Sequence, residues 1–174
     1  NQSVNVNKFL SRFKRVKYIC DNTNFDYFNK SYLINQALKE VTTEFTWMVD
    51  ADFFTDYQYV IDEIKTKYNH SDFIRPFSEI IFLDRTETES LFSLNKVILN
   101  NEEYKSNSQD GKYSFIVRTE VFKSCGGLNE DFKGWGYQDL DFVYNRLPTD
   151  ARKDHINKQA FHLQHEKAKK EHAV

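Results

Sequence analysis

The sequence predicts an α/β fold whose sheet is mostly parallel, with added antiparallel pieces. Two observations support this prediction. Short apolar runs bounded by turn residues alternate along the chain with segments whose apolar residues recur at helical spacing. In addition, the apolar run at 44–52 ends abruptly in acids, as expected of a buried strand that carries ligand-binding groups at its carboxyl end.

The composition is that of one globular domain. The 174 residues suffice for a single core, and a content of 40% hydrophobic and 16% aromatic residues excludes a disordered chain. The net charge of −2 gives no sign of the basic patch that nucleic-acid binding requires. No apolar run approaches the length of a membrane span. We expect a single domain over 1–166 and a charged tail at 167–174, with the two cysteines as buried reduced thiols.

The first half of the chain contains two expected strands and two expected helices. In chain order these are a strand at 15–22, a helix at 29–41, a strand at 44–52 and a helix at 57–68. Turn residues close the first strand. Apolar residues at helical spacing define both helices, and Ser31 is the expected N-cap of the first one.

The second half continues the alternation. Its expected elements are strand segments at 71–84, a helix at 87–100, a strand and a short helix at 112–127, a helix at 138–147 and a short strand at 159–166. Pro76 interrupts the strand segments because proline cannot donate to a ladder. Gly126 and Gly127 can stop the short helix.

Asp50 and Asp52 form an Asp-Ala-Asp motif directly after the apolar residues "FTWMV". On an extended segment these alternating side chains point to the same side. Two neighbouring carboxylates repel each other unless a cation or another donor lies between them. Their oxygens suit Mg²⁺ or Mn²⁺, with a substrate phosphate completing the coordination shell. Such a short motif also occurs as a solvated turn, but the apolar approach strand favours metal binding.

His162 and His165 lie three residues apart in "FHLQHE". On a helix they would share a face, and on a strand they would point to opposite sides. A lone histidine is more often structural than a ligand. An imidazole can nevertheless join carboxylates around Mn²⁺, so the pair and the acidic motif together form a candidate metal site.

The segment "GGLNEDFKGWGYQDLDF", residues 126–142, contains four of the five glycines of the chain. Glycine permits positive φ and close approach of a ligand to the backbone. Trp135, between two glycines, offers an indole face to a sugar. Asp139 and Asp141 follow at the expected start of a helix, where the helix dipole stabilises negative charge. The alternative is a glycine-rich loop with a core tryptophan and ordinary N-terminal acids.

Three segments resemble, in the same order, nucleotide-sugar glycosyltransferases of the GT-A fold, especially the β-1,4-galactosyltransferases and the galactosaminyl- and chondroitin-type transferases of family 2. "FNKSYLINQALKE" (28–40) is similar to the helix that helps hold the nucleotide. "WMVDADFF" (47–54) is similar to the metal-binding DxD strand, and 126–142 to the acceptor loop. The resemblance covers most of residues 15–166. It implies the GT-A fold, with a mostly parallel, Rossmann-like sheet flanked by helices.

The resemblance also implies a donor site for a UDP-sugar. Asp52, the second acid of the DxD motif, would bind Mn²⁺ (or Mg²⁺). Asp50 would contact the metal or the ribose of the donor. His165 would complete the metal site, with His162 as the alternative.

The resemblance also implies which residues contact the uridine end of the donor and which contact the acceptor. Phe28 and Lys30 match positions that touch the uridine end, although lysine here lacks the bidentate fork of the family's arginine. Asp139 matches the inverting catalytic base, and Trp135 would stack on the acceptor. Gln138 stands where the family has glutamate, which implies an altered acceptor preference. The implied acceptor-binding residues are Gly134, Trp135, Gly136 and Gln138.

The implied function is that of a hexosyltransferase in polysaccharide biosynthesis. It would move a hexose or N-acetylhexosamine, the galactose type being favoured, from a UDP-sugar to a sugar hydroxyl with inversion. A divalent cation stabilises a leaving diphosphate, and a carboxylate ionised at neutral pH can accept the proton of the attacking hydroxyl. Two alternatives stay open: a metal-dependent phosphoesterase, and a non-catalytic transferase domain that binds carbohydrate or nucleotide.

The family pattern has one further strand–helix unit before "RVKYICDN" (15–22), and fourteen residues precede that segment here. The resemblance therefore predicts a domain that is incomplete at its N-terminus, completed by a missing segment or a partner chain, or one that holds the base loosely. The few cysteines and the lack of a membrane span suggest a cytoplasmic, microbial-type enzyme, with a partner as the means of any membrane association.

Overall fold

The computed structural model describes residues 16–19, 28–94, 105–107, 114–132 and 136–165. Its helices are α2 (Lys30–Lys39), α3 (Tyr57–Thr66), α4 (Arg85–Leu94), α5 (Thr119–Ser124), α6 (Gln138–Asp141) and the π-helix η2 (Phe142–Arg146). Its strands are β1 (Phe45–Val49), β2 (Phe53–Phe54), β3 (Phe73–Arg75), β4 (Glu79–Phe82), β5 (Lys105–Asn107), β6 (Ser114–Arg118), β7 (Lys153–His155) and β8 (Gln159–His162). Among the described residues, no helix has the length and apolar character that crossing a membrane requires.

The described strands form two four-stranded sheets, ordered β1-β6-β3-β7 and β2-β8-β4-β5. The pairs β3–β7 and β4–β8 are parallel. The pairs β1–β6, β3–β6, β2–β8 and β4–β5 are antiparallel. The α/β class is thus confirmed, but the sheet in the described residues is mixed where a mostly parallel one was predicted. The main reason is that β6 runs against both of its neighbours.

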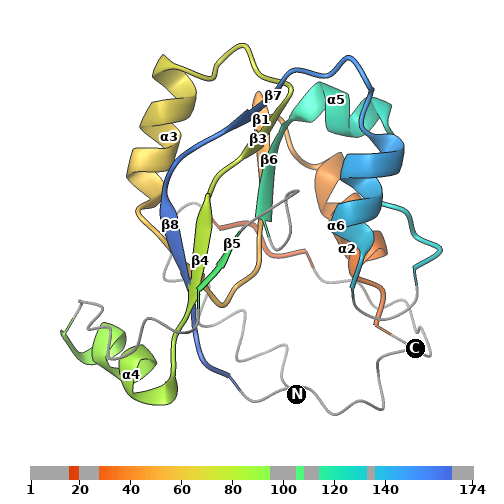
Figure 1. Cartoon of the computed structure of the whole chain (residues 1–174). Coiled ribbons are helices and arrows are strands. Elements are labelled where there is room, and N and C mark those ends of the chain that lie inside the picture. Colours follow the sequence, from red (N-terminus) through yellow and green to blue (C-terminus); the bar gives the residue numbers. More distant parts are fainter. Residues whose placement is uncertain (1–15, 20–27, 95–104, 108–113, 133–135, 166–174) are drawn as a thin grey trace.

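Strands β3 and β4 form one path that is interrupted at Pro76, as predicted (Figure 1). Proline has no N–H to donate to a ladder. The parallel partners β7 and β8 are interrupted at the same level. The Ile156 N–H donates to the Arg75 carbonyl at 2.9 Å, and the Ser78 N–H donates to the Lys158 carbonyl at 3.0 Å, so the pairing continues across the break.

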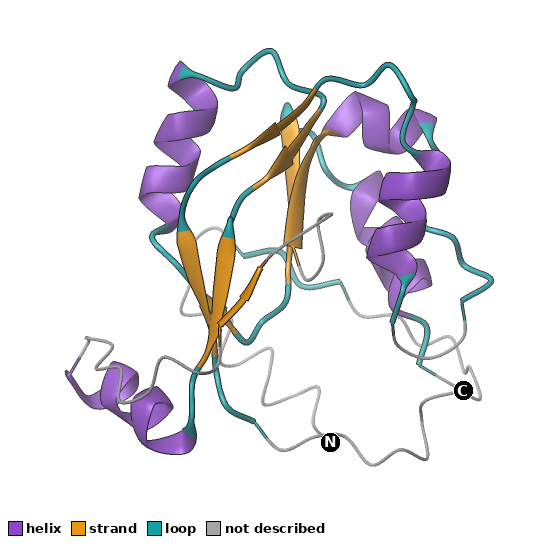
Figure 2. Cartoon of the chain, viewed as in Figure 1, coloured by secondary structure: helices purple, strands orange, loops and turns teal. Residues whose placement is uncertain are grey.

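The core lies on both faces of β6, with α3 on one side and α2, α5 and α6 on the other (Figures 1 and 2). Successive strand residues point to opposite faces. Phe115 therefore packs in the cluster on the α5 and α6 side, where its ring stacks on Phe142 with centroids 5.2 Å apart. Ile116 packs with Val60 of α3 on the other face. All four side chains are fully buried, and each such burial contributes about 1.5–3 kcal/mol.

Two predictions for the N-terminal part are wrong. Residues 16–19, predicted as part of a strand, are exposed and do not form one. An apolar run forms a strand only where a neighbouring strand pairs with it, and the local sequence does not reveal such a neighbour. The other residues of the segment 15–22 lie outside the described ones. Asn29, not Ser31, caps α2, and its side chain accepts the N–H of Tyr32 at 2.9 Å.

The helix predicted at 138–147 begins as an α-helix and continues as the π-helix η2. The Leu147 N–H donates to the Phe142 carbonyl at 2.8 Å, five residues back. The short strands β2, β5 and β7 were not predicted. The helix predicted at 87–100 begins at Arg85, and its residues after Leu94 lie outside the described ones, as does the expected tail at 167–174.

Cys125 is a free thiol that is partly buried. Its burial raises the pKa of the thiol, which keeps the group protonated and weakly reactive. Cys20, the other cysteine of the sequence, lies outside the described residues.

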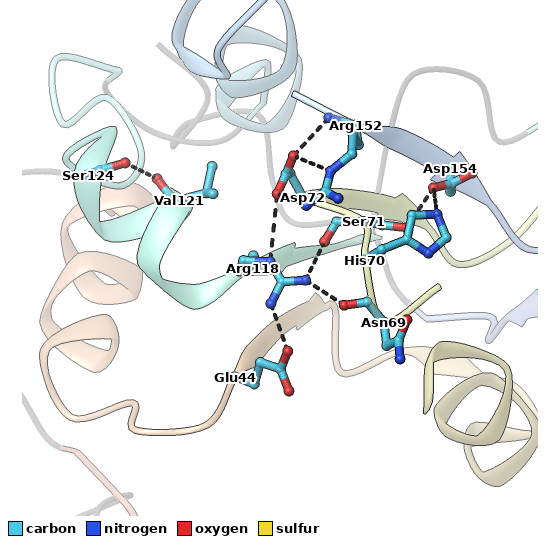
Figure 3. Close-up of polar contacts among 10 residues, drawn as sticks. All are labelled: Glu44, Asn69, His70, Ser71, Asp72, Arg118, Val121, Ser124, Arg152 and Asp154. Atoms are coloured by element: carbon cyan, nitrogen blue, oxygen red, sulfur yellow. Dashed lines mark hydrogen bonds and ion pairs between the residues drawn. The ribbon is translucent and has the colours of Figure 1, made fainter. Parts of the chain in front are cut away.

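Arg118, the last residue of β6, joins several segments at one end of the sheet (Figure 3). Its side chain is 14% exposed and donates to the Glu44 carboxylate at 2.7 Å. It also donates to the backbone carbonyls of Asn69 at 2.6 Å and Ser71 at 3.1 Å. The Asp72 carboxylate lies 3.6 Å from its Nε. The guanidinium thereby fixes the loop between α3 and β3 against the start of β1.

Asp72 lies between two arginines. Its Oδ2 accepts the backbone N–H of Arg152 at 2.9 Å and lies 3.3 Å from the Nε of the same residue. The hydrogen bonds from Arg152, together with the charges of Arg152 and Arg118, lower the pKa of the Asp72 carboxyl below its usual range.

The variant Asp72→Asn is expected to reduce stability at neutral pH more than in acid. Because the folded pKa is lowered, the contribution of Asp72 is complete above the ordinary Asp pKa, about 3.9, and is lost as pH falls through the lower folded value. We expect a loss of about 1–2 kcal/mol in the free energy of unfolding at pH 7, shrinking below about pH 3. Urea unfolding at both pH values measures this. An equal loss of stability at both pH values would contradict a lowered pKa for the Asp72 carboxyl in the folded state.

Candidate active site

Asp52, His162 and His165 bring three metal-binding groups together. The antiparallel pairing of β2 with β8 places Phe53 opposite His162, and the Leu163 N–H donates to the Asp52 carbonyl at 2.8 Å. The Asp52 Oδ2 lies 3.5 Å from the Nε2 of His162 and 3.0 Å from the Nε2 of His165. One ligand atom from each residue lies within 4.8 Å of the others. The sequence left open whether His162 and His165 point to the same side. In the structure both side chains lie beside the same carboxylate.

The His162 ring is held in a defined orientation. It stacks on Phe82, with centroids 4.9 Å apart, and meets Phe53 edge-on at 5.2 Å. Its Nδ1 lies 3.0 Å from the Leu163 carbonyl. A carbonyl oxygen can only accept, so in the neutral ring Nδ1 carries the proton and Nε2 presents its lone pair toward Asp52. A backbone partner on the second nitrogen is the arrangement that orients metal-binding histidines.

Asp52 has an unsatisfied oxygen. Its Oδ1 is buried and has no hydrogen-bond partner within the described part of the chain. A buried acceptor without a partner is costly unless a cation or donor lies beside it. Carboxylates suit Mn²⁺, and imidazoles bind first-row transition metals in general. The residues at this position therefore fit a divalent cation.

Asp50 and Asp52 face different partners. The chain turns directly after Asp50, where the Phe53 N–H donates to the Asp50 carbonyl at 3.2 Å. The predicted extended segment with both carboxylates on one side is therefore wrong. Asp50 pairs with Lys30 of α2, with 2.6 Å between Oδ1 and Nζ, and both side chains are about one-quarter exposed.

A cavity of about 290 Å³ lies between α2 and β1. Lys30 and Asp50 contribute its charged lining, while Ile34 and Met48 are among the apolar residues that form the remainder. Phe28, just before α2, is 52% exposed. The nucleotide-contacting residues implied by the resemblance therefore lie beside a cavity or at the surface.

Two asparagines join the helix α2 to the segment 127–130. The side-chain amide of Asn35 accepts the Leu128 N–H at 2.9 Å and donates to the Leu128 carbonyl at 2.9 Å. It also donates to the Glu130 carboxylate at 2.8 Å. Asn29 donates to the Glu130 carbonyl at 3.0 Å. Sequence reasoning missed this role, although an asparagine inside a helix is unfavourable by propensity and could have indicated it.

Of the predicted acceptor loop, 126–142, the structure describes residues 126–132 and 136–142. Trp135 and Gly134 lie outside the described residues. Gln138 is 3% exposed, and its Oε1 accepts the Gly136 N–H at 2.9 Å. Asp139 is partly buried at the start of α6, where its Oδ1 accepts the Leu140 N–H at 3.1 Å.

The candidate residues lie toward one end of the fold. In Figure 1 the carboxyl ends of β1 and β8 and the amino ends of α2 and α6 all lie toward the lower end of the molecule. This end carries the cluster of Asp52, His162 and His165, the ion pair of Lys30 and Asp50, and Asp139.

No model of a known protein family matches the sequence, and comparison with curated proteins finds no match. Among solved structures, the chain is similar to S. aureus TarS 1-349 in complex with UDP-GlcNAc. The TM-score is 0.61 and the sequence identity 18%, over 97% of this chain and 48% of the TarS chain. It also matches the catalytic domain of Drosophila beta1,4-galactosyltransferase 7 in complex with xylobiose, with a TM-score of 0.45 and 18% identity over 88% of this chain and 56% of the other.

The likeness to TarS shows the fold. The chain spans about half of the TarS chain, and almost all of it takes part in the match. Together with the mixed sheets and flanking helices, this confirms the GT-A fold that the sequence motifs predicted.

Proposed function

We propose that this chain belongs to an inverting, metal-dependent glycosyltransferase. It would move a hexose or N-acetylhexosamine from a UDP-sugar to a sugar hydroxyl. The observation that carries the proposal is the cluster of Asp52, His162 and His165, with its buried unsatisfied carboxylate oxygen, in a chain of GT-A fold. The UDP-GlcNAc in the TarS crystal supports a UDP-N-acetylhexosamine donor beside the galactose type expected from the sequence.

The residues at the ends of β1 and β8 would hold the donor. Asp52, His162 and His165 offer one oxygen and two nitrogens, a set that suits Mn²⁺ better than the oxygen-preferring Mg²⁺. The bound cation would stabilise the leaving diphosphate electrostatically. Lys30 supplies a cation at the first position of α2, and Asp50 keeps its ammonium in place. Phe28 offers an exposed ring for the uridine end.

Asp139 would act on the acceptor. Its carboxylate would accept the proton of the sugar hydroxyl as the hydroxyl oxygen forms a bond to the anomeric carbon. The bond from that carbon to the diphosphate breaks in the same step, and the diphosphate leaves with the electron pair. Attack from the opposite face inverts the anomeric configuration.

Thermal melting with Mn²⁺, UDP and both together tests the donor site. A ligand that binds only the folded state at 100 times its dissociation constant adds about 2.7 kcal/mol. For a chain of this size that corresponds to a rise of about 5–10 °C in Tm. We expect this rise with both ligands and expect Asp52→Asn to abolish it.

The matched control is Asp150→Asn, which makes the same charge change at an exposed turn residue and should keep the rise. A rise retained in Asp52→Asn would contradict the metal site. No rise in the wild-type chain would contradict donor binding. Release of phosphate from p-nitrophenyl phosphate without any sugar acceptor would favour the phosphoesterase alternative. A rise in Tm without turnover of UDP-sugars would favour the non-catalytic one.

A further inference from the structure

Tyr137 has two properties that packing does not explain. It is the only non-glycine residue with positive φ in the described part of the chain, at φ 65°. For a residue with a Cβ this conformation costs about 1–2 kcal/mol. The residue is also 73% exposed, so burial of its ring does not offset the cost. A strained backbone at an exposed aromatic residue indicates a role in ligand contact.

The surrounding turn holds Tyr137 in this conformation. On one side, the buried Gln138 amide accepts the Gly136 N–H at 2.9 Å, and Gly136 itself has φ 115°. On the other side, the Asp141 N–H donates to the Tyr137 carbonyl at 2.9 Å in the first turn of α6. The backbone of Tyr137 is therefore fixed before any ligand binds, which lowers the entropic cost of binding.

Tyr137 lies two residues before Asp139. Consecutive Cα atoms are about 3.8 Å apart, so the two Cα atoms are separated by at most about 7 Å. This distance is close to the width of one sugar ring. If Asp139 receives a hydroxyl proton, that sugar lies close to the backbone of Tyr137, whose long side chain is exposed and free of close packing.

We propose that Tyr137 contacts the acceptor, an inference that rests on the proposed transferase function. Its ring would pack against the apolar C–H face of the pyranose whose hydroxyl is presented to Asp139. An exposed tyrosine offers such a face together with a polar hydroxyl at its edge. Gln138 is the positioning residue that holds the turn, because its side-chain oxygen is already engaged by Gly136.

Saturation-transfer NMR tests this proposal with the methyl β-glycosides of glucose, galactose, N-acetylglucosamine and N-acetylgalactosamine as probes. The full chain is used with Mn²⁺ and UDP present. We expect at least one glycoside to bind the wild-type chain and Tyr137→Phe. In Tyr137→Gly its dissociation constant should rise about tenfold, as expected for loss of an aromatic contact. The Tm of Tyr137→Gly should stay equal or rise, because glycine adopts φ 65° without strain.

Tyr144→Ala is the matched control, since Tyr144 is 62% exposed on the following π-helix and should not affect glycoside binding. Equal binding by Tyr137→Gly would overturn the proposal. So would weaker binding that is accompanied by a lower Tm, because this would indicate a structural role. A wild-type chain that shows the Mn²⁺ and UDP rise in Tm but binds none of the four glycosides would overturn the acceptor role while leaving the donor site intact. Absence of that rise would instead count against the proposed function itself.

Discussion

The variant Asp139→Asn is expected to reduce sugar transfer by about 10²–10⁴-fold, the range for loss of a general base. Asparagine keeps the size of the side chain and can still accept the Leu140 N–H, but it cannot take a proton from the acceptor hydroxyl. UDP release from UDP-GlcNAc and UDP-galactose, measured with and without methyl glycosides, gives the rate. The rise in Tm with Mn²⁺ and UDP should be unchanged, since Asp139 does not belong to the metal cluster.

Asp141→Asn is the matched control for this experiment. It makes the same charge change two residues further along. The Asp141 Oδ1 accepts the side-chain N–H of Asn145 at 2.8 Å, and its Oδ2 lies 3.4 Å from the Nε of Arg146. We therefore expect Asp141→Asn to lower stability and to keep turnover. Wild-type rates in Asp139→Asn, or an equal loss of turnover in both variants, would contradict the proposed role of Asp139 as the base.

The variant Gly127→Ala is expected to cause the largest loss of stability. Gly127 has φ 72°, where a residue with a Cβ is strained by about 1–2 kcal/mol. A Cβ at this position would lie 2.2 Å from the Asn35 Oδ1, so the Asn35 side chain would have to move. Its hydrogen bonds to Leu128 and Glu130 would then be lost. We expect a total loss of about 3 kcal/mol or more, measured by urea unfolding.

Gly126→Ala separates the two contributions. Gly126 has φ 74°, and a Cβ there would have its nearest neighbour, Arg146, at 4.0 Å. It should therefore show only the backbone strain of about 1–2 kcal/mol. The double variant Asn35→Ala with Gly127→Ala should lose less than the sum of the single variants, because both remove the same contacts. Equal losses of stability in the two glycine variants would contradict the expected clash between the new Cβ at position 127 and the Asn35 side chain.

Most helices and longer strands could be predicted because their side-chain periodicity is a local property. Helix α3 shows its apolar stripe directly in the sequence, and Pro76 marks the break between β3 and β4 without further information. The strand predicted at 15–22 is absent from its described part, 16–19, because strand formation is not a purely local property. The apolar residues of this segment suit a strand, but strand formation depends on a hydrogen-bonding neighbour, which a local pattern does not identify.

The candidate site was predicted in its residue types and not in its contacts. The motif of Asp50 and Asp52 predicted two carboxylates at the end of a strand, and both lie there. The turn after Asp50 then directs one carboxylate to Lys30 and the other to the histidines. That division depends on the pairing of β2 with β8, which joins residues more than 100 positions apart.

The sequence by itself determined the α/β class, most of the elements and the acids, histidines and glycines of the candidate site, because these follow from periodicity and side-chain chemistry. Only the tertiary structure decided which of these residues meet. The Asn35 side chain binds the backbone of Leu128, and His162 and His165 both lie beside the Asp52 carboxylate. The physical reason is that each of these contacts pairs a polar group with a partner from a distant segment. Burial then makes that pairing obligatory, whereas a local pattern leaves it open.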